Sequence, residues 1–177
     1  MKVVMSIGNP IKSDDNIGNI VLDRLDVKNI NKIKAGVTPE NFVSKLKDYD
    51  EIVILDALDF GGKIGEVRVF NPNEIKDVLL STHSIPIGLL KKFLPNSKIK
   101  IIGIQSKTIN LGEKLSKELE NKIEEIVEKV TLFLKQWMLL LKLKQSLWFA
   151  MEVKSLLKID KIKIMKWVVI AKAKWKL

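Results

Sequence analysis

Short apolar runs alternate along the chain with segments in which apolar residues recur every three or four positions. The runs at 2–7, 30–36, 51–55 and 98–104 predict strands, and the apolar–polar alternation at 65–70 predicts an edge or half-buried strand. A helix is predicted from Ile17, with Ile20, Val21, Leu22 and Leu25 on one face. Another is predicted after Thr38, a candidate N-cap followed by Pro39. A short helix is expected at 85–94. A long closing helix is traced by Leu111, Leu115, Leu119, Ile123, Ile126, Val127, Val130 and Leu134.

This alternation of strands and helices is typical of a parallel sheet wrapped by helices, and predicts an α/β fold. With 177 residues, the chain has the length of one domain. We place that domain at residues 1–135, because the pattern changes near Gln136.

Residues 136–177 contain all four tryptophans and no Gly, Pro, Asn or Thr. They hold 10 of the 31 Lys and Arg residues but only 2 of the 21 Asp and Glu residues, a net charge of +8 that leaves +2 for residues 1–135. One interpretation is a basic amphipathic segment that lies on a membrane or a partner. The favoured one is a segment outside the fold, such as a read-through or frameshifted end, because the closing helix already completes the architecture.

Composition excludes several classes of function. The chain has no cysteine, hence no disulfide, thiolate metal site or cysteine nucleophile. It has no signal peptide and no run of about 18 apolar residues, so we expect a cytoplasmic protein. The nearly neutral body lacks a basic stripe with interleaved aromatic residues, so we expect no nucleic-acid binding.

Residues that could bind a metal or act in catalysis lie near the ends of the predicted strands. Asp14 and Asp15 follow the first strand, Asp56 follows the strand at 51–55, and His83 precedes the helix at 85–94. Ligands of open parallel sheets bind beyond the carboxyl ends of the strands. One member of the acidic pair is also a candidate N-cap of the helix near Ile17. Together, carboxylates and an imidazole suit a divalent ion such as nickel or zinc.

Five separated motifs, "GNPIKSDDNIG", "VTPENF", "ILDALDFGGKIGEVRVFNP", "STHSIPI" and "IGIQ", resemble in order and spacing those of the hydrogenase maturation proteases. The resemblance runs from residue 2 to about 134. It implies a three-layer α/β/α sandwich around a mostly parallel twisted sheet. It also implies that Asp15, Asp56 and His83 contact nickel, and that Gly8, Asn9, Asp14 and Gln105 shape or support the site. This chain departs from the family pattern at Asn16, where Gly is common, and at Ser106, where Pro is common.

The resemblance further implies an endopeptidase that removes a C-terminal extension from the large-subunit precursor of a nickel–iron hydrogenase. The nickel is carried by the substrate, and no tightly bound metal of the protease's own is expected. The catalytic base stays open, with Asp15 and Asp56 as candidates. We expect a monomer whose partner is the precursor, with membrane contact only if residues 136–177 belong to the protein.

Two other functions fit part of the pattern. A receiver domain phosphorylated on Asp56 would use the acidic pair with Thr82 and Lys107, but "GNPIKS" separates the acids from the strand and His83 is unexplained. A peptidyl-tRNA hydrolase-like esterase shares the "GNP" turn, yet the chain has no histidine before His83.

Overall fold

The computed structural model describes residues 1–76, 87–112 and 114–157. The chain divides into two compact units, Met1–Lys135 and Gln136–Leu177, and each is described by itself.

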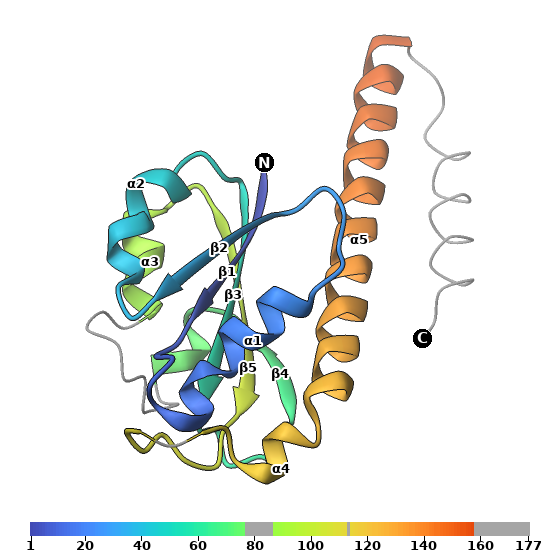
Figure 1. The fold of residues 1–177 in the computed structure, drawn as a ribbon. Helices are drawn as coiled ribbons and strands as arrows, with labels where there is room; N and C mark the ends of the chain where they lie inside the picture. The colour runs from blue at the N-terminus through green and yellow to red at the C-terminus, as the bar shows by residue number, and fades with distance from the viewer. Residues whose placement is uncertain (77–86, 113, 158–177) are drawn as a thin grey trace. The chain divides into compact units, whose positions relative to one another are not determined.

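The first unit is built on a five-stranded sheet in the order β2-β1-β3-β5-β4 (Figure 1). The four strands β1, β2, β3 and β5 run parallel, and β4 pairs with the outer edge of β5 in the antiparallel direction. Their bounds are Lys2–Ile7 for β1, Asn31–Gly36 for β2, Glu51–Leu58 for β3, Val67–Phe70 for β4 and Lys98–Gln105 for β5.

Helices cover both faces of this sheet, which gives the three layers of an α/β/α sandwich (Figure 1). On one face, α2 and α3 cover a core that includes Met5, Ile54 and Leu90. On the other face, α1 contacts β1 and β3, and its Arg24 forms an ion pair with Glu124 at the start of α5. The helices are α1 Ile17–Arg24, α2 Val43–Leu46, α3 Ile87–Phe93, α4 Lys117–Glu120 and α5 Ile123–Leu157; single 3-10 turns are η1 Ser13–Asn16, η2 Pro39–Phe42 and η3 Glu74–Lys76.

The predicted strands are all present, and the apolar runs explain why. Every residue of β3 is buried, because β3 has β1 and β5 as neighbours and helices on both faces. Such a strand reads as a continuous apolar run rather than as an alternation. The half-buried pattern of β4 reflects its place at the edge of the sheet.

Several expectations about element ends are wrong. The strand predicted at 51–55 continues to Leu58, so Asp56 lies inside β3 rather than after it. The closing helix does not include Leu111 or Leu115: Leu111 is 68% exposed, and the helical residues begin with the short α4 at Lys117. Leu111 and Leu115 match the helical spacing, but they lie in a loop that precedes the helices.

The capping predictions also need correction. Neither Asp14 nor Asp15 caps α1; Asn16 occupies the N-cap position, and its side chain makes no capping hydrogen bond. Thr38 does precede Pro39 at the start of η2, but it too makes no side-chain cap. Both helices instead begin as a 3-10 turn that runs into an α-helix.

In the second unit, residues 136–157 continue α5 without a break in secondary structure. The prediction that residues 136–177 lie outside the functional domain stays a prediction. No helix among the described residues is sufficiently long and apolar to span a membrane.

Candidate active site

The site lies where the order of the strands reverses. From β1 the chain crosses to β2 on one side, then returns to form β3 on the other side of β1. The carboxyl ends of β1 and β3 therefore flank a topological switch point, where open α/β sheets bind their ligands. The loop after β1 carries Asp14 and Asp15, and β3 carries Asp56 near its end.

A backbone N–H group of the turn after β1 holds the carboxylate of Asp15. The Asn9 N–H donates to Asp15 Oδ2 at 2.7 Å, and Asp15 is only 2% exposed. Gly8 has φ +151°, and a Cβ on it would lie 2.1 Å from the carbonyl oxygen of Asp15. A residue without a side chain is therefore required where the strand meets the turn.

Ser6 and Asn19 form a buried polar pair beneath this turn, and neither residue was predicted from the sequence. Ser6 Oγ donates to Asn19 Oδ1 at 2.7 Å, and Asn19 Nδ2 donates to the Gly8 carbonyl at 3.1 Å and to Asn16 Oδ1 at 2.9 Å. This network fixes the backbone immediately before the Asn9 N–H. A signal was available: Ser6 is the one hydroxyl residue in the apolar run of β1.

Gly18 brings the acidic turn close to β3. A Cβ at Gly18 would lie 2.8 Å from the carbonyl oxygens of both Ile7 and Leu55, so α1 begins in close contact with the ends of β1 and β3. The turn Ser13–Asn16 contacts β3 as well. Asp56 follows Leu55 and is fully buried. Close packing of this helix start thus places the Asp15 turn against the strand that bears Asp56.

The other member of the acidic pair, Asp14, joins two loops. Its fully buried carboxylate accepts hydrogen bonds from the backbone N–H groups of Lys107, Thr108 and Ser116 at 2.9, 3.2 and 2.7 Å, and from Ser116 Oγ at 2.9 Å. The Asp14 N–H in turn donates to the Thr108 carbonyl. Asp14 therefore anchors the loop that follows β5 to the loop that follows β1.

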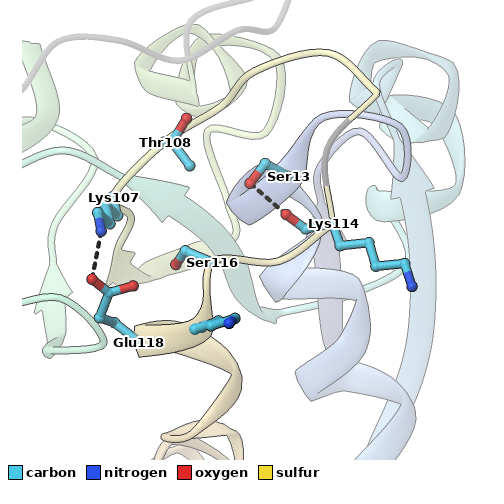
Figure 2. A pocket seen from close by; sticks show the side chains of 7 residues that line it. Ser13, Lys107, Thr108, Lys114, Ser116 and Glu118 are labelled. Atoms are coloured by element: carbon cyan, nitrogen blue, oxygen red, sulfur yellow. Dashed lines mark hydrogen bonds and ion pairs between the residues drawn. The ribbon is translucent and has the colours of Figure 1, made fainter.

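A hollow of about 470 Å³ opens beside this junction (Figure 2). Figure 2 shows two links at its rim: Ser13 Oγ donates to the Lys114 carbonyl at 2.8 Å, and Lys107 pairs with Glu118. A second hollow, of about 370 Å³, borders the Asp15 turn through Pro10, Asn16 and Asn19. Neither hollow is lined by Asp15 or Asp56.

Gln105, at the end of β5, holds the loop after β3. Its Oε1 accepts from the N–H groups of Phe60 and Gly62 at 2.9 and 3.0 Å, and its Nε2 donates to Asp59 Oδ1 at 3.0 Å and to the Ser106 carbonyl at 2.9 Å. The Gln105 amide, with a smaller contribution from the Gly61 N–H, lowers the pKa of the Asp59 carboxyl.

His83 lies outside the described residues, as does Thr82. In the part of the chain that the structure describes, no three histidine or carboxylate side chains are grouped so that they would hold a metal ion. The assignment of Asp15, Asp56 and His83 as nickel contacts therefore stays a prediction.

Comparison with known proteins identifies the family of this chain. The hydrogenase maturation protease family matches residues 20–132. A putative hydrogenase maturation protease of Methanocaldococcus jannaschii is 34% identical over 150 residues, which cover 70% of this chain and 89% of that protein. The chain belongs to the hydrogenase maturation protease family.

Solved structures of the family share the fold. The crystal structure of a [NiFe] hydrogenase maturation protease from Thermococcus kodakarensis superposes with a TM-score of 0.62 at 29% identity, covering 76% of this chain and 92% of that one. A solution structure of an Escherichia coli endopeptidase gives a TM-score of 0.65 at 23% identity, over 74% of this chain and 90% of that one. The three-layer α/β/α sandwich predicted from the motifs is thus confirmed.

Membership of this protease family excludes the receiver-domain and peptidyl-tRNA hydrolase interpretations. Lys107, which the receiver interpretation would place beside a phosphorylated Asp56, instead pairs with Glu118. Its backbone N–H donates a hydrogen bond to Asp14 Oδ2.

Proposed function

We propose that the protein is an endopeptidase that removes a C-terminal extension from the nickel-loaded large-subunit precursor of a hydrogenase. Family membership supports proteolysis in hydrogenase maturation. The observation that carries the finer proposal is the packing of the Asp15 turn against β3, the strand that bears the buried Asp56, at the switch point of the sheet.

The proposed ligands suit nickel held by the substrate. Carboxylate oxygens and an imidazole nitrogen form the mixed donor set that such an ion accepts. His83 stands four residues before Ile87, the first residue of α3. By the alternation of side chains along a strand, Asp56 lies on the same sheet face as Ile54 and Leu58, the face that α3 covers. The sequence position of His83 and the face of Asp56 thus support one common site.

The reaction is hydrolysis of one peptide bond: water adds to the scissile carbonyl, the C–N bond breaks, and the products are a new C-terminal carboxylate and a free amine. A substrate-held metal would fix the scissile peptide beside the two carboxylates. Either Asp15 or Asp56 is a candidate to take the proton of the attacking water. We further propose that the protease works as a cytoplasmic monomer and holds no tightly bound metal of its own.

The decisive experiment mixes the purified protein with nickel-loaded and nickel-free precursor and follows the precursor by intact mass. We expect cleavage of the nickel-loaded form and none of the nickel-free form. Equal cleavage of both forms, or digestion of casein, would contradict the proposal.

Variants test the residues. Asp15→Asn, Asp56→Asn and His83→Ala should each abolish cleavage, because each removes one proposed contact to the metal. Asp15→Glu should retain partial activity, since it keeps a carboxylate oxygen. Asp26→Asn changes an exposed carboxylate outside the site and is the matched control, with activity expected to equal that of the parent.

A further inference from the structure

The second unit, residues 136–177, has a charge that the proposed function does not use. It carries a net charge of +8, whereas residues 1–135 carry +2. The family match ends at residue 132, before this segment begins. Most of the positive charge of the protein thus lies beyond the residues that match the family.

The helical part of this unit presents an apolar face. Leu139, Leu140 and Leu143 are 42, 59 and 47% exposed, although leucine is a residue that folding usually buries. They stand at positions i, i+1 and i+4 of α5, which place them within about 100° on one side of the helix. Water is an unfavourable environment for such a face.

The tryptophans of the chain follow the same division. All four tryptophans lie in residues 136–177 and none in residues 1–135. An indole ring combines an apolar body with one polar N–H, and tryptophan is enriched where hydrocarbon meets the polar headgroups of a bilayer. Lysine, leucine and tryptophan together are typical of helices that lie in a membrane surface.

We propose that residues 136–177 bind the surface of an anionic lipid bilayer. The exposed leucines insert at the boundary between headgroups and acyl chains, and the lysines are attracted by the negative surface potential. Within the described part of the segment, residues 136–157, no helix is long and apolar enough to span a membrane, and the proposal concerns binding to the membrane surface. A polyanion such as nucleic acid would match the charge but would leave the leucine face in water.

The experiment uses the full chain and vesicles of phosphatidylserine and phosphatidylcholine, with pure phosphatidylcholine vesicles as the neutral comparison. Tryptophan fluorescence reports on residues 136–177 alone, because no other part of the chain contains tryptophan. We expect a blue shift and co-sedimentation with the anionic vesicles, at an affinity at least about tenfold above that for neutral ones. Binding should fall steeply as salt is raised to about 1 M, where screening is nearly complete.

Two matched variants separate this face from general stickiness. Leu139→Gln/Leu140→Gln/Leu143→Gln removes the exposed face and should reduce anionic-vesicle binding about tenfold or more. Val69→Gln/Phe93→Gln/Leu111→Gln removes three apolar side chains outside α5 that are 40, 52 and 68% exposed, and should leave binding unchanged. Glutamine keeps helix propensity in α5, and the control positions are exposed, so both variants should retain their circular dichroism.

Four outcomes would overturn the proposal: equal affinity for neutral vesicles, sedimentation of the chain without vesicles, equal loss in both triple variants, or binding of a DNA 20-mer without binding to anionic vesicles. None of them bears on precursor cleavage, which is measured without lipid.

Discussion

A buried carboxylate is tolerated only where hydrogen-bond donors replace the water that it loses. Asp14 meets this requirement with donors that lie 93 to 102 positions away along the chain. A sequence pattern cannot reveal such partners, because it records local spacing. The family resemblance implies a supporting role for Asp14, and local spacing makes it only a candidate N-cap of the adjacent helix. Only the folded chain shows that it anchors the loop after β5.

This contact predicts a large loss of stability on removal of Asp14. Asp14→Ala leaves the N–H groups of Lys107, Thr108 and Ser116 without their acceptor, and should cost about 2–4 kcal/mol in the free energy of unfolding. Asp14→Asn keeps one acceptor oxygen and should cost less. Urea unfolding measures both, with the exposed Asp26→Ala as a control that should stay within about 0.5 kcal/mol of the parent. A loss below 0.5 kcal/mol for Asp14→Ala would show that the loops do not depend on this carboxylate.

At the scale of elements, periodicity located the strands well and the ends of elements poorly. β1, β3 and β5 lie in the middle of the sheet, so burial on both faces makes most of their positions apolar. The start of the closing helix was misjudged because Leu111 matches the helical spacing, yet its backbone pairs with Lys12 in an isolated bridge. That bridge joins the two loops of the site, and no local pattern encodes it.

The packing of α1 on the sheet makes Gly18 sensitive to any side chain. In Gly18→Ala, the new Cβ would lie 2.8 Å from the carbonyl oxygens of Ile7 and Leu55, so the helix must move away from β1 and β3. We expect a loss of about 1–3 kcal/mol by urea unfolding, with reduced precursor cleavage because the Asp15 turn moves with the helix. Asp23→Ala on the exposed side of α1 is the control, and should lose no more than about 1 kcal/mol with its surface ion pair to Lys34.

The loop after β3 should respond to acid through Asp59. The pKa of Asp59 in the folded protein is below its ordinary value of 3.8, first because of Gln105 and then because of Gly61. The ionised carboxylate therefore stabilises the folded state above pH 3.8, and this contribution is lost as the pH falls through the lowered pKa. Gln105→Ala should raise the pKa of Asp59 toward 3.8 in an NMR titration. The pKa of Glu74, which Asn71 lowers, should not change and is the internal control.

In the whole molecule, residues 1–135 should fold and unfold independently of residues 136–177. The buried apolar residues of β1, β3 and β5 all lie in residues 1–135, as do Ile126, Val130 and Leu134 on the buried side of α5. A chain ending at Lys135 therefore keeps these residues and loses one buried apolar side chain, that of Trp137, which is 9% exposed. We expect it to unfold in urea in one cooperative transition and to cleave nickel-loaded precursor at the parent's rate.

The single tyrosine makes this prediction measurable. Tyr49 is 7% exposed and its hydroxyl oxygen accepts a hydrogen bond from Asn31 at 3.2 Å, so its environment reports on the core of residues 1–135. Without the four tryptophans, tyrosine fluorescence is observed directly. It should change at the same urea concentration as the circular dichroism at 222 nm, because a cooperative domain loses its packing and its helices together. Two separate transitions, or a gradual change without a baseline, would show that residues 136–177 contribute to the core and that the boundary at Lys135 is wrong.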